Sequence, residues 1–161
     1  MRRAGWVAVV AGAVLAVVAV LVLLRPTSES PAPARSPTGT PSSYATAVVR
    51  ATNAARTAAG LDALAPSSCA TAEALRRADA LRGSAALEHA SLDPVLAACR
   101  PAATAAENLS RADAPAQDVV AAWMGSPGHR KNILDPTLTQ LGVGCVLDGT
   151  AVLCSEVFVG P

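Results

Sequence analysis

The sequence has few aromatic residues and no concentration of basic charge. Its 161 residues include two Trp, one Tyr and one Phe, and its 13 basic and 12 acidic side chains are scattered to give a formal net charge of +1. A protein that neutralises phosphates gathers Lys and Arg on one face, so we expect no nucleic-acid partner. Because alanine-rich helices with few aromatics bury little apolar area, the fold needs additional stabilisation.

Charged residues are absent from residues 4–24, which follow Arg2 and Arg3. As a helix this run spans about 30 Å, the thickness of a hydrocarbon core. A cleavable signal has a shorter apolar region of about 7–15 residues, and no clear A-x-A site closes this one. We therefore predict an uncleaved membrane helix within residues 1–24, with the arginines in the cytoplasm and the remainder outside the cell membrane. Secretion after signal cleavage is the alternative.

Residues 25–43 are rich in Pro, Ser and Thr and contain almost nothing to bury. This composition predicts an extended spacer. Residues 44–161 remain as one folded domain, which is within the usual size range.

The pattern of residues 44–161 predicts helices first and a hairpin last. Helices are expected over 43–59, 68–82 and about 115–125, with a helical turn near 93–99 and strands near 141–147 and 151–159. Ser43 is a candidate N-cap, Gly60 a helix stop, and Ser126 the cap of a short turn that begins at Pro127. This order predicts an α+β fold.

The second helix has an apolar stripe at roughly helical spacing. We expect the stripe to face the core and the charged side chains to face solvent. The stripe is Ala72, Leu75, Ala78 and Leu81, and the charged residues are Glu73, Arg76, Arg77 and Arg82.

No C-x-x-C pair occurs, which disfavours a cysteine metal site, and the four cysteines favour disulfides in a chain that leaves the cytoplasm. Three connectivities are open, and four free thiols are a further alternative. Cys145 and Cys154 bracket a segment in which Gly149 supplies the positive φ of a tight turn, which would place them opposite each other on adjacent strands. Cys69 and Cys99 then remain to pair together.

Several short motifs follow one another in order along residues 45–161. Together they resemble bacterial SCP-like domains of the CAP superfamily, the cysteine-rich secretory, antigen 5 and pathogenesis-related proteins. The resemblance implies an α-β-α sandwich with a small antiparallel sheet between helices, and one or two further strands within 84–112. The motifs are N-x-x-R with GL-x-x-L (Asn53, Arg56, Gly60, Leu61, Leu64), the isolated His89, E-N-L at 107–109, W-M-x-S-P-G-H-R-x-N-I-L at 123–134, G-V-G at 142–144 and V-F at 157–158.

The two histidines of the chain both fall inside these motifs. In many members of the family two His and two acidic side chains converge in a central cleft, and matching the motifs gives His89, Glu107 and His129. The second acid is expected just beyond the Trp of the third helix, where this chain has Ser126. The set is therefore incomplete unless Glu88 or Asp93 reaches in.

Two imidazoles and a carboxylate would suit Zn²⁺ or another divalent cation with an open coordination position. They would equally suit acid-base chemistry near neutral pH. A committed nucleophile is missing, because none of the available serines lies in a G-x-S-x-G setting. These serines are Ser84, Ser91, Ser110 and Ser126.

Structural roles compete with these functional ones. Glu107 would then fix its loop together with Asn108, His129 would be a surface or capping residue after Gly128, and His89 a plain surface residue. Asn53 and Arg56, three residues apart on one helix, are expected to anchor it to neighbouring loops, and Trp123 is expected in the core.

Three functions follow for the sequence. The first is a binding module whose cleft holds a divalent cation, a peptide or an apolar ligand such as a lipid. The second is a metal-assisted hydrolase or peptidase that uses His89, Glu107 and His129 around a water molecule. The third is an inert structural domain of the cell envelope. We favour the first, because the residues identify a cleft better than a reaction.

Overall fold

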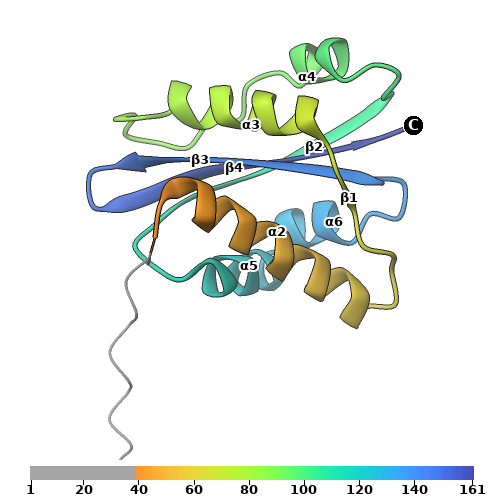
Figure 1. The fold of residues 1–161 in the computed structure, drawn as a ribbon, viewed down its shortest axis with the longest axis horizontal. Helices are drawn as coiled ribbons and strands as arrows, with labels where there is room; N and C mark the ends of the chain where they lie inside the picture. The colour runs from red at the N-terminus through yellow and green to blue at the C-terminus, as the bar shows by residue number, and fades with distance from the viewer. Residues whose placement is uncertain (1–38) are drawn as a thin grey trace, which may run out of the picture. The chain divides into compact units, whose positions relative to one another are not determined.

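The computed structural model describes residues 39–161, so the predicted membrane helix and most of the predicted spacer lie outside the described residues. A four-stranded sheet lies between two helical layers, with α3 and α4 on one face and α2, α5 and α6 on the other (Figure 1). This confirms the expected α+β class and the α-β-α layering. Within residues 39–161, none of the helices combines the length and apolar character needed to cross a membrane.

The sheet is mixed and not purely antiparallel. Its strand order is β1-β3-β4-β2. The strands are β1 (Ala65–Pro66), β2 (Thr104–Ala112), β3 (Gln140–Asp148) and β4 (Ala151–Gly160). β3 and β4 form the predicted hairpin and β4 pairs antiparallel with β2, but β1 pairs parallel with β3. The prediction of an antiparallel sheet was wrong at this edge because the short connection from α2 to α3 runs alongside β3 in the same direction.

Helix α2 (Pro41–Ala58) begins within the segment expected to be spacer. Its N-cap is Thr40 and not Ser43, because the Thr40 hydroxyl accepts a hydrogen bond from the Ser43 backbone N–H at 3.2 Å. Pro41 stands at the start of the helix, where a missing N–H costs nothing. Gly60 follows the helix with φ of 79°, as a helix stop requires.

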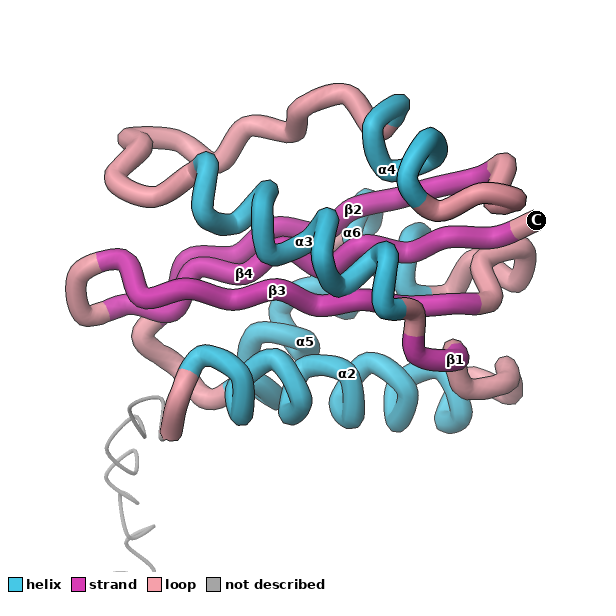
Figure 2. Tube along the Cα trace, turned by 45° about the horizontal axis from the view of Figure 1, so that its top comes forward, coloured by secondary structure: helices cyan, strands magenta, loops and turns pink. Residues whose placement is uncertain are grey.

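Helix α3 (Ser68–Ala80) presents a different face to the core from the predicted one. Its buried residues are Ala70, Glu73, Ala74 and Ala78, whereas Leu75 is 48% exposed. The cause lies in β3, where a Cβ at Gly142 or Gly144 would collide with the α3 backbone. Figure 2 shows α3 lying over β3. An approach this close admits only alanine between the backbones and leaves the leucine outside.

The remaining helices agree with the sequence pattern. They are α4 (Asp93–Ala98), α5 (Ala116–Gly125) and α6 (Pro127–Ile133). Trp123 is buried in the core between α2, α5 and the sheet, as expected, and its indole N–H donates to the Leu109 carbonyl at 3.2 Å.

Both predicted disulfides are present. Cys145 and Cys154 face each other across the β3–β4 hairpin, which turns at Gly149 with φ of 65°. Cys69 at the start of α3 is joined to Cys99 after α4.

Candidate functional site

Glu107 is a buried carboxylate on β2, the strand at one edge of the sheet. Its Oε1 accepts hydrogen bonds from Arg77 Nε at 2.6 Å and Ser155 Oγ at 2.7 Å. Its Oε2 accepts one from an Arg77 terminal nitrogen at 2.8 Å and lies 2.8 Å from His89 Nδ1. The two-point contact with Arg77 has the planar geometry that guanidinium and carboxylate share.

The charge state of Glu107 follows from these contacts. Burial acts to raise its pKa, but hydrogen bonds from Arg77, Ser155 and His89 act in the opposite sense and leave the pKa of Glu107 below its usual value. The carboxylate is therefore ionised at neutral pH, and both of its oxygens already have donors.

Arg77 also fixes the loop that carries His89. Its terminal nitrogens donate to the carbonyls of Ala90 and Ser91, both at 3.0 Å. The bond to Glu107 is the main cause that raises the pKa of Arg77, so the guanidinium stays charged. From the sequence, Arg77 was expected in solvent, and this was wrong: its side chain is only 11% exposed. Arg77 follows the buried Ala74 by three residues, so the two side chains lie on the same face of α3.

Ser155 was also missed as a site residue. It occupies a fully buried position on β4 between the apolar residues Leu153 and Val157, which lie on the same face of the strand. A lone hydroxyl in such an alternating apolar series needs a hydrogen-bond partner, which would have been a usable signal.

His89 lies on the loop between α3 and α4, and its side chain is 54% exposed. Because Glu107 is ionised and can only accept, the His89 Nδ1 carries the hydrogen of their bond. The lone pair of Nε2 is then left for a ligand, in the way that carboxylates orient metal-binding or catalytic imidazoles.

His129 is on α6, which packs on the opposite face of the sheet from α3 (Figure 1). Its ring centroid lies 6.3 Å from that of Trp123. Burial, and secondarily the positive charge of a protonated His89, lower the pKa of His129. His129 is therefore neutral at pH 7, and the two imidazoles are near enough to sense each other's charge.

The predicted metal set is not assembled as three ligands. Among the residues described, no group of three or more His, Cys, Asp or Glu side chains is arranged to hold a metal ion. Glu107 does not fit a position in direct contact with a cation, because Arg77, Ser155 and His89 already occupy its oxygens. Glu107 instead fits the role of a carboxylate that accepts a hydrogen bond from a ligating imidazole and orients it. A cation held by His89 and His129 stays a prediction.

The position of the expected fourth acid is held by Ser126, the N-cap residue of α6, whose carbonyl accepts from Arg130 N–H at 2.9 Å. Two residues further along the chain, a Cβ at Gly128 would meet nothing within 4 Å among the described residues.

Of the two alternatives for the fourth acid, Glu88 shares a cavity with Glu107. It lines the same cavity of about 380 Å³ between α3 and the His89 loop. Asp93 instead accepts from the Ser91 hydroxyl at 2.9 Å within its own loop.

The candidate nucleophiles are not activated by the histidines. Within residues 39–161, neither imidazole is hydrogen-bonded to Ser84, Ser91, Ser110 or Ser126. Ser110 is opposite Cys154 on β4, and residues paired in this way share a face, so its hydroxyl faces the core on the α2 side.

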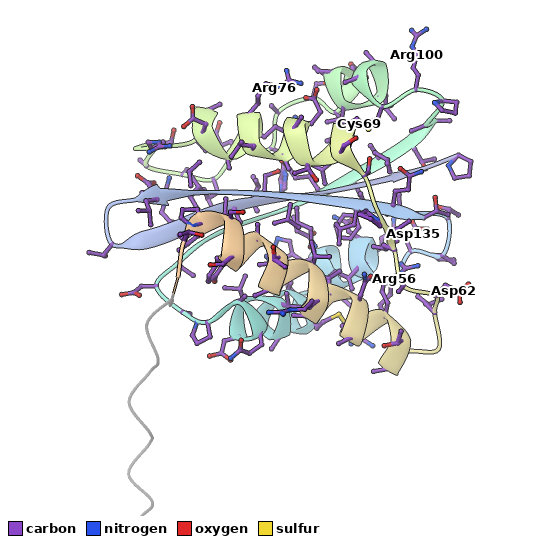
Figure 3. All side chains as sticks on the ribbon, in the orientation of Figure 1. Arg56, Asp62, Cys69, Arg76, Arg100 and Asp135 are labelled. Carbon is purple, nitrogen blue, oxygen red and sulfur yellow. A yellow bond between two sulfur atoms is a disulfide. The ribbon has the colours of Figure 1, made fainter. Side chains whose placement is uncertain are left out.

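Asn53 and Arg56 tie α2 to the loops beside it. The Asn53 amide makes two hydrogen bonds with the Leu64 backbone, at 2.8 and 3.1 Å. The buried Arg56 guanidinium donates to the carbonyls of Asp62, Ile133 and Asp135 at 2.8 to 2.9 Å. Figure 3 shows Arg56 beside the segments that carry Asp62 and Asp135.

Asn108 joins β2 to α6 and to a second buried acid. Its Nδ2 donates to Glu156 Oε2 at 3.0 Å, and its Oδ1 accepts from Asn132 Nδ2 at 3.0 Å. Asn132 also donates to the Glu107 carbonyl at 3.0 Å. Glu156 was not singled out from the sequence, although it interrupts a buried strand in the same way as Ser155.

Comparison with known proteins identifies relatives of this arrangement. The model of the cysteine-rich secretory protein family, CAP, matches residues 49–159. The uncharacterized protein YkwD of Bacillus subtilis (strain 168) is 46% identical over 57 residues, which are 35% of this chain and 21% of that protein. The chain thus spans about a fifth of this curated relative.

Solved structures share the fold. An extracellular protein containing an SCP domain from Bacillus anthracis str. Ames matches with a TM-score of 0.65 and 22% identity, over 74% of this chain and 41% of that chain. A cysteine-rich secretory protein from Staphylococcus aureus has a TM-score of 0.61 and 20% identity, over 85% and 41%. An outer surface protein from Borrelia burgdorferi has a TM-score of 0.64 and 15% identity, over 70% and 89%.

Proposed function

Because this chain belongs to the cysteine-rich secretory protein (CAP) family, we propose that it is an extracytoplasmic binding module that presents the imidazoles of His89 and His129 to a divalent cation or a small ligand. The observation that carries the proposal is the hydrogen bond between His89 Nδ1 and the ionised Glu107 at 2.8 Å. It fixes one tautomer, with Nδ1 towards Glu107 and the lone pair on Nε2.

Neutral imidazoles are suitable ligands for Zn²⁺ and similar cations. His89 would bind through Nε2, with Glu107 behind it, and His129 would add a second neutral ring whose pKa is lowered by burial. When bound, such a cation supplies a positive charge that attracts carboxylate or carbonyl groups of a ligand. Two protein ligands leave coordination positions for those groups.

The neighbouring cavity supports a small organic ligand as well. Its volume is about 380 Å³, at the lower end of small-molecule sites, and Glu107 forms part of its wall. Aliphatic groups of Ala80, Leu81, Ala90 and Pro94 line it beside charged side chains. A short peptide or part of a lipid matches this mixed lining.

Extracytoplasmic location is supported by three observations. The two disulfides indicate an oxidising compartment, the N-terminal apolar run predicts a membrane anchor, and two of the solved relatives are described as extracellular or outer surface proteins. Attachment through residues 1–24 remains a prediction.

A metal-assisted hydrolase is the second candidate. The His89–Glu107 pair has the form of a general base held by an orienting carboxylate. Binding is favoured over hydrolysis because both oxygens of Glu107 already accept hydrogen bonds from Arg77, Ser155 and His89, so this carboxylate is not free to act on a water molecule.

Calorimetric titration of Zn²⁺ into the oxidised full chain tests the proposal. We expect one-to-one binding that is weakened at least tenfold in His89→Gln and in His129→Gln, and unchanged in Lys131→Gln on the exposed side of α6. If Zn²⁺ does not bind, the cation part of the proposal is wrong, and short peptides and lipid vesicles are titrated next. If peptides and lipid vesicles also fail to bind, an inert structural domain of the cell envelope is favoured.

An assay of turnover distinguishes the second candidate, the metal-assisted hydrolase, from a binding module. Hydrolysis of a peptide library that requires Zn²⁺ and disappears in His89→Gln would establish an enzyme. Binding without turnover would support the module.

A further inference from the structure

Glu156 is a fully buried carboxyl group that lacks a cationic partner within the described residues. Its position on β4 lies between Cys154 and Phe158, which face the core under α2. Its two donors are neutral: Thr52 Oγ1 to Oε1 at 2.6 Å and Asn108 Nδ2 to Oε2 at 3.0 Å.

The charged groups around Glu156 are committed elsewhere or face other directions. Arg56, one turn after Thr52 on α2, donates to backbone carbonyls. Glu107, next to Asn108 on β2, points to the opposite face of the sheet, where it meets Arg77. From α6, His129 contributes a backbone carbonyl to Asn108 at 3.5 Å, while Arg130 and Lys131 are exposed.

A chain of amides connects this acid to α6. Asn108 lies between Glu156 and Asn132, and Asn132 bridges Asn108 Oδ1 and the Glu107 carbonyl. Since α6 also carries His129, the acid is two hydrogen bonds away from the helix that bears one of the two candidate ligands.

We propose that Glu156 is a proton-sensitive switch: its ionised form holds the Asn108 and Asn132 amides in the arrangement that ties α6 to β2, and protonation loosens that tie. The inference goes beyond the proposed function, because it concerns the position of α6 whether or not the site binds a cation.

The chemistry of the carboxyl group gives the reason. An ionised carboxylate only accepts hydrogen bonds, and both donors to Glu156 match it. Protonation turns charge-assisted bonds into neutral ones of about half the strength. A proton that faces Asn108 further requires this amide to present its oxygen, which would place two NH₂ groups against each other at the Asn108–Asn132 contact.

The switch operates near physiological pH. Burial raises the pKa of Glu156 to about 7, against a smaller opposite effect of the Thr52 and Asn108 hydrogen bonds. An acid of ordinary pKa would stay ionised throughout the pH range of a cell envelope.

Selective labelling makes the test direct, because Asn53, Asn108 and Asn132 are the three asparagines of the chain. The full chain in mild detergent, labelled with [¹⁵N]asparagine and [¹³C]glutamate, is titrated from pH 5.5 to 8.5 by NMR. We expect the side-chain amide signals of Asn108 and Asn132 to shift with the midpoint of the Glu156 carboxyl. Asn53, which binds the Leu64 backbone, should stay constant and serves as the internal control.

Two variants separate the effect of Glu156 from that of the imidazole on α6. Glu156→Gln should make the Asn132 signal independent of pH, whereas His129→Gln should retain the shift. The proposal is wrong if Asn132 does not follow Glu156 in the unmodified chain, or if its shift disappears in His129→Gln. These two outcomes decide the question even if Glu156→Gln fails to fold.

Discussion

Glu107 and Glu156 are both buried on neighbouring strands, yet their surroundings shift their pKa values in opposite directions. Glu107 meets a guanidinium, a hydroxyl and an imidazole, and its pKa is lowered. Glu156 meets a hydroxyl and an amide, and its pKa is raised to about 7. The contrast arises because one residue faces α3 with Arg77 and the other faces α2, whose nearby Arg56 is used by backbone carbonyls.

The first prediction concerns the Arg77–Glu107 pair. Arg77→Gln leaves a buried carboxylate without its cation, which should lower the free energy of unfolding by about 3 kcal/mol at pH 7. It should also release the His89 loop, since the contacts with Ala90 and Ser91 are lost. Urea unfolding and NMR line widths of the His89 ring measure the two effects.

Arg82→Gln is the matched control, because Arg82 lies just after α3 and pairs with Asp79 where both side chains are exposed, by 50% and 63%. Its effect should stay below about 0.5 kcal/mol. Equal losses in the two variants would contradict the role assigned to Arg77.

The second prediction is a pH dependence with a definite sign. Since the pKa of Glu156 is raised from 4.5 to about 7, the native state holds a proton between these values that the unfolded state has lost. Stability from this group is therefore complete below pH 4.5, falls as pH rises towards 7, and is lost above it. Between pH 5 and 8 the loss is on the order of 2 kcal/mol.

Urea unfolding at several pH values measures this slope as the difference between the unmodified chain and Glu156→Gln. Glu107 has the opposite slope, because its lowered pKa gives stability that is present above pH 4.5 and lost as pH falls below its folded pKa. A difference between the two proteins that does not change with pH would show that Glu156 stays ionised.

At the level of the elements, the contact between α3 and β3 decides which helical face is buried. Gly142 and Gly144 leave no side chain on their side of β3, so the α3 backbone lies directly on the strand. We predict that Gly144→Ala costs about 3 kcal/mol, because its Cβ would collide with the Leu75 backbone, which cannot move aside as a side chain would. Thermal unfolding measures the change.

Gly125→Ala provides the comparison. A Cβ at Gly125, the last residue of α5, meets nothing within 4 Å among the described residues, and alanine is the better helix former. This variant should be neutral or slightly stabilising. Similar destabilisation by both substitutions would mean that loss of glycine, and not the close approach, is responsible.

The same contact explains what could be predicted from the sequence. Helical spacing and turn residues located the helices and the β3–β4 hairpin, because these are local properties. The buried face of α3 was wrong, because a leucine stripe carries the stronger apolar signal and the glycines that exclude it are about 70 residues away in the chain. β2 was expected from the family resemblance alone, since T-A-A-E-N-L-S-R-A lacks a clear strand alternation.

The candidate site, like the fold, combines local motifs with contacts between residues far apart in the sequence. Motif order gave His89, Glu107 and His129 as candidates, but the contacts that set the charge of Glu107 come from Arg77 and Ser155, which belong to other elements. The sequence offered Glu107 as a cation ligand, whereas the guanidinium from α3 makes it an orienting acceptor. That difference depends on tertiary contacts that no local pattern contains.

At the scale of the whole molecule, the two helical layers are stabilised differently. The α2, α5 and α6 layer packs around large residues such as Trp123, Ile133 and Phe158. The α3 and α4 layer rests on small ones, including Ala70 and Ala74, together with Val95. The Cys69–Cys99 disulfide closes the segment that holds α3, the His89 loop and α4, so it supports the layer that carries His89 and Arg77.

We therefore predict that the two disulfides differ in their effect on the site. Removing Cys69–Cys99, with a sequence separation of 30, should cost about 3.5 kcal/mol, against about 2.5 kcal/mol for Cys145–Cys154 with a separation of 9. Hydrogen exchange of the Cys69→Ala/Cys99→Ala variant should increase first in α4 and the His89 loop. In Cys145→Ala/Cys154→Ala it should increase at the hairpin, while the His89 loop keeps its protection. Uniform loss of protection in both variants would show instead that the layers unfold as one unit and that the site has no separate support.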